Sequence, residues 1–292
     1  MQSRANPQRN MLALTRRVQP QPTEVARTRL HLATVRARLK ASFESRILLI
    51  GSHSRGTAIR WHSDVDALIL LSRDEARWGG RPVSSRTILN RVREDLEDRF
   101  KFTDIRGDQQ AVVVGFASGD QSLDVVPGVF SSFNDGQPIY AIPDGAGDWM
   151  PTSPMAHNKY FSDAAARSIG KLPKVVQLLK WWKYARAQPI PIQSFHLDML
   201  LAASELCVGV KPYTHCLYLA FKLLRERECA AFRDPLGIAG LISAAKTQAQ
   251  RETLLNAVDH ALYHAQAAVA AEALKDFEEA NRQWDIVFNG QY

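Results

Sequence analysis

The spacing of hydrophobic positions changes along the chain, from helical to strand-like and back to helical. Between residues 23 and 45, apolar side chains recur three and four positions apart, at Leu32, Val35, Leu39 and Phe43, which predicts a long helix. Shorter apolar runs bounded by polar turns predict the next group of elements. These are strands at 46–50, 65–71, 110–116 and 122–126, and a helix at 85–101.

The second half of the chain has a helical pattern. Residues 134–154 are rich in Pro, Gly and Asp, which predicts a loop or a crossing between domains. The helices predicted after it cover residues 163–187, 194–208, 213–230, 236–248 and 251–281. A hairpin turn is expected at residues 118–120. The expected fold is α/β followed by all-α, with one domain at 1–156 and another at 157–292.

Charge is unevenly distributed. The formal net charge is +7, yet residues 1–60 hold 12 Lys or Arg against 2 Asp or Glu. A basic region of this kind suits a polyanionic partner, although charge alone favours an ordinary solvated helix face. Pro7, Pro20 and Pro22 indicate that the first 20 residues form a flexible extension.

The cysteines and the apolar runs exclude several protein classes. Cys207, Cys216 and Cys229 are widely spaced and contain no Cys-x-x-Cys pair. They predict neither a disulfide framework nor a zinc site, and they fit a reducing, cytoplasmic setting. No apolar run approaches the roughly 18 residues of a membrane span, so no membrane association is expected.

One acid-x-acid pair, Asp64 and Asp66, differs from the others by its position. The other pairs fall in predicted helices, where residues two apart point in different directions. Asp64 and Asp66 open an apolar strand, so their carboxylates share one face, about 6.6 Å apart along the chain. Like charges held together need a cation or a shared proton, and oxygen ligands select Mg²⁺ or Mn²⁺.

A third carboxylate, Asp124, lies in the otherwise apolar strand segment 123–126. If this strand pairs beside the first, three carboxylates converge. Three carboxylates that hold two divalent ions about 3.5–4 Å apart are the arrangement used for phosphoryl and nucleotidyl transfer. The predicted catalytic residues and metal ligands are therefore Asp64, Asp66 and Asp124, with two Mg²⁺ or Mn²⁺ ions.

A small-residue turn precedes the acids. Gly51 and Ser52 end the first strand, and small residues there let backbone N–H groups approach phosphate oxygens. The turn is not a P-loop, because no Gly-Lys-Ser/Thr follows. A Gly-Ser turn, an Asp-x-Asp strand and a later strand aspartate form a specific constellation, which predicts that Gly51 and Ser52 bind a nucleotide.

The strings around these residues resemble the polymerase-β-like nucleotidyltransferases. They are similar in particular to the bacterial cGAS/DncV-like nucleotidyltransferases, the cyclic-oligonucleotide synthases of antiphage defence. The strings are 51–59, 63–66, 110–114 and 123–128, followed by 174–183, 193–200 and 284–290. The resemblance runs from about residue 22 to the C-terminus.

The resemblance implies a role for each matching residue. Asp64 and Asp66 would hold both metal ions, and Asp124 would hold the ion that activates the attacking ribose hydroxyl. Ser52 would bind the donor triphosphate, for which the resemblance implies ATP or another NTP.

Three residues of the helical half would contact the nucleotide as well. Lys180 matches a lysine that reaches the phosphates; without the resemblance, a capping or solvated lysine is the ordinary interpretation. Ser194 matches a phosphate-contacting serine. Phe195 matches an aromatic residue, usually Tyr, that stacks on a base, so the stack is kept while a hydrogen bond from the hydroxyl is lost. Asp198, on an apolar helix, is expected to pair with an arginine or a backbone group.

The resemblance also implies the fold and the reaction. The fold would be a polymerase-β-like core with an N-terminal spine helix and a C-terminal helical domain. The reaction would transfer a nucleotidyl group from an NTP to a ribose hydroxyl, release pyrophosphate, and close a cyclic di- or trinucleotide second messenger for antiphage signalling. A regulatory protein partner is implied, and nucleic acid is expected to bind only weakly and nonspecifically.

Two alternatives remain open from the sequence. One is a template-independent RNA or tRNA nucleotidyltransferase, or a linear oligoadenylate synthase, which would share the three acids and hold RNA with the basic region. The other is an antitoxin-type nucleotidyltransferase that modifies proteins. Members of that class are usually much shorter and lack a long helical half.

Overall fold

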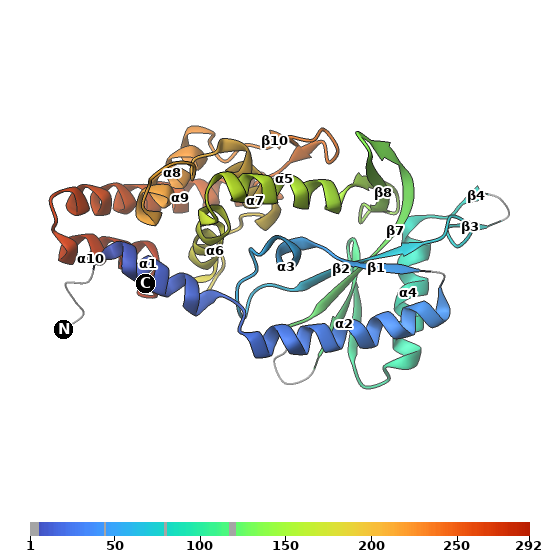
Figure 1. Cartoon of the computed structure of the whole chain (residues 1–292). Helices are drawn as coiled ribbons and strands as arrows, with labels where there is room; N and C mark the ends of the chain where they lie inside the picture. The colour runs from blue at the N-terminus through green and yellow to red at the C-terminus, as the bar shows by residue number, and fades with distance from the viewer. Residues whose placement is uncertain (1–5, 44, 79–80, 117–120) are drawn as a thin grey trace. The chain divides into compact units, whose positions relative to one another are not determined.

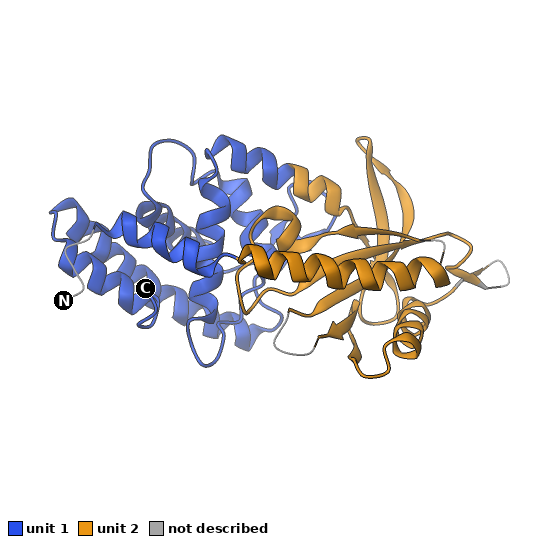
Figure 2. Cartoon of the chain, turned by 60° about the horizontal axis from the view of Figure 1, so that its bottom comes forward, with its two compact units in different colours: residues 1–19, 160–292 blue, residues 20–159 orange. Residues whose placement is uncertain are grey.

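The computed structural model describes residues 6–43, 45–78, 81–116 and 121–292. The turn expected at residues 118–120 lies outside these ranges. The chain forms two compact units, which are described separately (Figure 2). The sheet unit is Pro20–Lys159, and the helical unit combines Met1–Gln19 with Tyr160–Tyr292. This division differs from the expected 1–156 and 157–292, chiefly because the N-terminal segment belongs with the helical unit.

The sheet unit is built around one seven-stranded mixed sheet (Figure 1). Its strands are β1 (Arg46–Leu49), β2 (Val65–Leu71), β5 (Asp104–Asp108), β6 (Ala111–Gly115), β7 (Leu123–Asn134), β8 (Gln137–Pro143) and β9 (Trp149–Thr152), with a separate ribbon of β3 (Arg77–Trp78) and β4 (Arg81–Pro82). Its helices are α2 (Pro22–Ser42), α3 (Gly51–Arg55) and α4 (Ser85–Arg99), and α5 (Pro154–Arg167) begins in this unit and ends in the other. The strand order is β1-β2-β7-β6-β5, and β8 pairs with both β7 and β9.

The two faces of this sheet have different partners. Residues of β2 and β7 that point to one face, among them Val65, Ala67, Leu123 and Val125, are buried in a core with residues of α2 and α4. Because side chains alternate along a strand, the residues between them, which include Asp66 and Asp124, point to the opposite face. The helices thus cover one face and leave the acids on the other.

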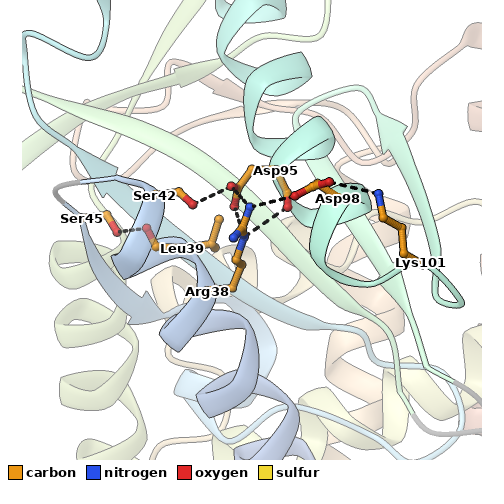
Figure 3. A network of polar contacts seen from close by, with 7 residues as sticks. All are labelled: Arg38, Leu39, Ser42, Ser45, Asp95, Asp98 and Lys101. Carbon is orange, nitrogen blue, oxygen red and sulfur yellow. Dashed lines mark hydrogen bonds and ion pairs between the residues drawn. The ribbon is translucent and has the colours of Figure 1, made fainter.

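A polar network fixes α2 against α4 on the covered face (Figure 3). Arg38 Nε donates to Asp95 Oδ2 at 3.0 Å, and the Ser42 hydroxyl also donates to Asp95. Both partners of the ion pair are mostly buried, with side-chain exposures of 25% and 12%. Arg38 is also within 3.6 Å of Asp98, which bonds Lys101 in turn. Directional contacts of this kind set the rotation of a helix more sharply than apolar packing does.

The helical unit packs its helices around buried aromatic side chains. Its elements are α1 (Pro7–Val18), the end of α5, α6 (Lys171–Tyr184), α7 (Ser194–Ser204), α8 (Tyr213–Glu226), a ribbon of β10 (Phe232–Arg233) and β11 (Leu241–Ile242), α9 (Gln248–Ala273) and α10 (Phe277–Val287). Trp182, Phe221, Trp284 and Phe288 are fully buried in it. Among the described residues, no helix has the length and hydropathy needed to cross a membrane.

The expected flexible extension is wrong for residues 7–18, which form the helix α1. Pro7 stands at the first helical position, where its missing N–H costs nothing, and the Asn6 side chain accepts from Gln8 N–H as the N-cap. Met11, Leu14 and Val18 are buried at a helical spacing. The prolines therefore start helices and mark their boundaries here.

Several predicted boundaries in the second half are also wrong. The predicted helix 163–187 is broken at Ile169 and Gly170, both with positive φ, and the predicted helix 251–281 is broken near Lys275. The predicted helix 236–248 is absent. Instead Asp234 accepts from the N–H groups of residues 236, 238 and 239, which closes the loop between β10 and β11.

Residues 134–154, expected as a loop, contain the whole of β8 and β9. These strands extend the sheet from the C-terminal half of β7, across a register shift between Phe130 and Ser132. The sequence did not predict these strands because they contain prolines, which strands tolerate chiefly at edges and bulges.

Candidate active site

Three carboxylates lie at the end of the sheet where β2 and β7 begin. The two strands are parallel neighbours, and their register places Asp66 opposite Asp124. Asp64 directly precedes β2, where the Ser122 hydroxyl donates to its carboxylate and Val65 N–H donates to Ser122 O at 2.9 Å. The pairing of these strands, on which the convergence of the acids depended, is thus present.

The glycine-serine turn lies against one of these acids. Ile50 N–H donates to Asp66 O at 2.9 Å, which holds the end of β1 beside the start of β2. A Cβ atom on Gly51 would lie 1.8 Å from Asp66 Oδ2, and Gly51 has φ +66°. Only glycine combines this backbone angle with the absence of a side chain, so the close approach of the turn to the carboxylate requires Gly51.

Ser52 follows within the short helix α3. The helix is closed by Gly56, whose left-handed conformation forms the C-cap, and by Thr57 N–H, which donates to Ser52 O at 2.9 Å. The Ser54 hydroxyl donates to Gly51 O at 2.8 Å and accepts from Asn158 Nδ2 at 3.0 Å. Because α3 has only five residues, its dipole is small, and any phosphate contact depends on individual N–H and hydroxyl groups.

Asp124 is the acid of the cluster whose pKa is raised by burial and by the charges of the other two. Burial, reinforced by the negative charges of Asp64 and Asp66, raises the pKa of Asp124 to about 7. Within the described part of the chain, its Oδ1 atom is buried and accepts no hydrogen bond. A buried acceptor without a donor is costly, and a cation compensates both the missing bond and the repulsion.

These residues fit a divalent metal site in their chemistry. Carboxylate oxygens from adjacent strands are the ligands that Mg²⁺ and Mn²⁺ prefer. Across the described ranges, no three His, Cys, Asp or Glu side chains are already gathered around one point. The fit therefore rests on the donor set and on the uncompensated Asp124 oxygen.

The remaining predicted residues lie in the helical unit. Ser194 and Phe195 are half-buried in the first turn of α7. This turn is held at its start, because Gln193 N–H donates to Ala244 O at 2.8 Å. His196 Nδ1 lies 3.0 Å from Ile242 O, a second bond to the segment that follows β10.

Lys180 is buried, with 1% of the residue exposed, and is neither a capping nor a solvated lysine. Its Nζ lies 3.0 Å from Asp198 Oδ1, and both side chains are at most 2% exposed. A charge partner of Asp198 is therefore Lys180 of α6, where an arginine was the expected cation. Burial, with a smaller effect of the Lys180 charge, lowers the pKa of the neighbouring Lys183 to about 8.

The sequence analysis missed Ser122 and Asn158 as neighbours of the site. Ser122 bonds Asp64, and Asn158 bonds the α3 hydroxyl of Ser54. A serine directly before the strand of Asp124 was a readable signal, because parallel pairing places it beside Asp64. Asn158 gave no signal, since 104 residues separate it from its partner.

Known proteins share this sequence pattern and fold. The family described as "Second Messenger Oligonucleotide or Dinucleotide Synthetase domain" (SMODS) matches residues 6–164. The chain is 23% identical over 235 residues to a probable cyclic nucleotide synthase of Bacillus cereus (strain VD146), covering 78% of this chain and 68% of that protein. It is 25% identical over 210 residues to the cyclic AMP-AMP-AMP synthase of Escherichia coli (strain MS 115-1). This match covers 68% of this chain and 64% of that protein.

A solved structure extends the likeness to the whole chain. The E. coli MS115-1 CdnC:HORMA-deltaN complex matches with a TM-score of 0.75 and 19% identity, covering 97% of this chain and 97% of the matched one. At this identity the likeness concerns the fold, and it confirms the predicted mixed α/β core followed by a helical region.

Proposed function

The chain belongs to the family of second messenger oligonucleotide or dinucleotide synthetases, and we propose that it joins NTPs into a cyclic di- or trinucleotide. The observation that carries this proposal is the start of the parallel pair β2 and β7, where Asp66 lies opposite Asp124 and Gly51 contacts the Asp66 carboxylate. This arrangement supports a phosphate-binding turn beside oxygen ligands for a divalent ion. The names of the two curated relatives, both cyclic nucleotide synthases, support ring closure.

The family depends on metal, and we propose two Mg²⁺ or Mn²⁺ ions as the specific cofactors. Asp64, Asp66 and Asp124 would hold them. When bound, such ions neutralise the charge that develops on the transferring phosphoryl group and favour the deprotonated ribose hydroxyl. In the protein itself, the buried position of Asp124 keeps a basic oxygen beside the Asp66 carboxylate.

The other residues act by positioning the substrate. Gly51 and Ser52 would orient the triphosphate of the donor NTP, so that the reacting groups are held in the geometry that the transfer requires. In the helical unit, we assign phosphate contacts to Lys180 and Ser194 and a base stack to Phe195, on the resemblance alone. Lys180 would take this role only by sharing its ammonium group with Asp198 or by leaving it.

A regulatory protein partner and a cytoplasmic location are further parts of the proposal. The partner is supported by the complex of the structurally similar CdnC with a HORMA protein. The location is supported by Cys207, Cys216 and Cys229, which are all free and buried. Nucleic acid is proposed to bind only weakly and nonspecifically.

Mass spectrometry of the products formed from four NTPs with Mg²⁺ or Mn²⁺ tests the function. The proposal expects a product of fixed mass that alkaline phosphatase does not alter, because a ring has no terminal phosphate. Asp66→Asn should form none while keeping its fold, and Asp135→Asn, an acid in the turn between β7 and β8, serves as the control. A phosphatase-sensitive ladder would indicate a linear oligoadenylate synthase, and transfer of nucleotide to a protein would indicate the antitoxin-type alternative.

A further inference from the structure

A cavity of about 280 Å³ opens at the edge of the sheet unit next to Asp64. Its walls come from three places that are distant in sequence. They are α2, through Glu24, Arg27, Thr28 and His31; the turn before β2, through Trp61, His62, Ser63 and Asp64; and the two residues that precede β7, Gln121 and Ser122. The volume is at the small end for ligand sites, which suits one base or nucleoside-sized group.

The aromatic wall of this cavity is held in an unusual conformation. Trp61 has φ +66°, which is an outlier for a bulky residue, yet 58% of the residue is exposed. The turn that carries it is closed from both sides: Ile59 N–H donates to Ser63 Oγ at 2.9 Å, and Ser63 N–H donates to Ile59 O at 3.2 Å. Strain of this kind persists where the surroundings over-determine it, and it clusters at ligand sites.

Arg60 supports the ring from one side. Its Cζ lies 4.4 Å from the centroid of the Trp61 ring. The guanidinium is itself fixed, because it donates to Glu24 at 2.8 and 3.0 Å, and Glu24 also accepts from Gln21 N–H at 2.7 Å. An exposed tryptophan that is already held in place loses little freedom when a second flat group stacks on it.

The polar groups of the cavity suit the rest of a nucleotide. Thr28, Ser63 and Gln121 can donate and accept hydrogen bonds at the edge of a base. Arg27 supplies a cation on the α2 wall, while the charge of Glu24 is compensated by Arg60. His31 is held by a parallel stack on Phe116, with centroids 3.8 Å apart.

We propose that this cavity binds the base of one nucleotide, with Trp61 as its stacking platform and Arg27 as the partner of its phosphate. The inference rests on the proposed function for the identity of its ligand, since nucleotides are the substrates and products of that reaction. Asp64 forms one wall, so a nucleotide bound here lies beside the carboxylate cluster, with its phosphate toward Arg27. The cavity thus serves a nucleotide that takes part in, or is left by, the transfer step.

Equilibrium binding of AMP, GMP, CMP and UMP, each measured in EDTA, tests the proposal apart from catalysis. Trp61→Ala should weaken binding of the preferred mononucleotide by about tenfold, in the range of one base–aromatic stack. Trp61→Phe keeps a stacking face and should lose much less. Phe102→Ala removes a fully exposed aromatic residue of the same unit that does not line the cavity, and it should change nothing.

A second pair of ligands separates the base from the phosphate. Arg27→Gln should weaken binding of the mononucleotide and leave binding of the matching nucleoside unchanged. The inference is overturned if wild type binds no mononucleotide at millimolar concentration, or if Trp61→Ala, with wild-type thermal stability, binds as wild type does. Because EDTA removes divalent ions and a mononucleotide has no pyrophosphate to release, no catalysis occurs, and binding that depends on Trp61 would stand even if no cyclic product were ever found.

Discussion

At the scale of single residues, the site depends on a contact that tolerates no side chain. Gly51 and Gly56 both have positive φ, at +66° and +69°, so each is strained by any substitution. They differ in their surroundings, since a Cβ on Gly51 would overlap the Asp66 carboxylate, whereas nothing lies within 4 Å of a Cβ on Gly56. Substituting alanine at each of the two positions therefore separates the effect of backbone strain from the effect of displacing Asp66.

We expect Gly51→Ala to abolish product formation and Gly56→Ala to keep most of it. The Gly56 variant should lose about 1–2 kcal/mol of unfolding free energy, the cost of a left-handed alanine. The Gly51 variant should lose at least that much and also displace Asp66. Product yield and urea unfolding of the two proteins measure both effects; comparable activity of the two variants would show that the contact with Asp66 is unimportant.

At the scale of elements, α6 and α7 are joined by a buried charge pair. Lys180 and Asp198 lie on different helices, and their side chains are 2% and 0% exposed. Burying two charges is costly, so such a pair is poor evidence for stability in itself. Removing one partner is different, because it leaves the other charge buried without compensation.

Lys180→Met should cost about 3–5 kcal/mol of unfolding free energy, and Lys180→Met with Asp198→Leu should recover most of that loss. Chemical denaturation of the wild type, both single variants and the double variant gives the coupling energy. Activity then decides the role of the lysine. A stable double variant with wild-type turnover would remove Lys180 from nucleotide binding, whereas a stable, inactive one would support its phosphate contact.

A buried histidine on α7 makes part of the stability depend on pH. His196 is 1% exposed, and burial lowers its pKa to about 4. The unfolded chain takes up this proton near pH 6.5, so unfolding binds a proton between pH 6.5 and 4. Stability is thus retained above pH 6.5 and falls, by up to about 1.4 kcal/mol per pH unit, as the pH drops toward 4.

His196→Gln should flatten this dependence while lowering stability at pH 7, because the ring also stacks edge-on with Phe232. Urea unfolding of both proteins at pH 7, 6 and 5 measures the difference. Parallel curves for wild type and variant would mean that His196 titrates normally in the folded protein.

At the scale of the whole molecule, each compact unit is completed by residues distant in sequence. The helical unit includes α1, which contacts α6, α8 and α10. Tyr213 N–H donates to Gln8 Oε1 at 2.6 Å, and the Tyr292 hydroxyl donates to Pro7 O at 2.9 Å. Residues 7–18 are therefore part of the fold of a unit whose other residues begin at position 160.

Leu14→Ala should cost about 2–5 kcal/mol of unfolding free energy, as expected for a leucine that is 1% exposed. Arg16→Ala, on the exposed side of the same helix, should change it by no more than about 0.5 kcal/mol. Thermal or urea unfolding distinguishes the two. Equal stability of both variants and wild type would restore the view of residues 1–20 as a dispensable extension.

The sequence by itself determined the local elements and the identity of the acid cluster. β2 was predicted with its observed bounds, and the spacing of two between Asp64 and Asp66 fixed their common face, because strand periodicity is a property of the backbone. The glycine-serine turn, the beginning of the strand of Asp124 and the helix α2 could be predicted for the same reason: each depends on residues that are close together in the sequence.

Only the tertiary structure decided what depends on distant partners. The helix α1 has a local N-cap and a proline at its first position, but it is stabilised by the helices of residues 160–292, which bury Met11 and Leu14. β8 and β9 exist because β7 offers an edge to pair with, and Lys180 is buried because Asp198 lies on another helix. Composition gave no sign of these partners, since the free energy of pairing and burial comes from contacts between segments that the sequence places far apart.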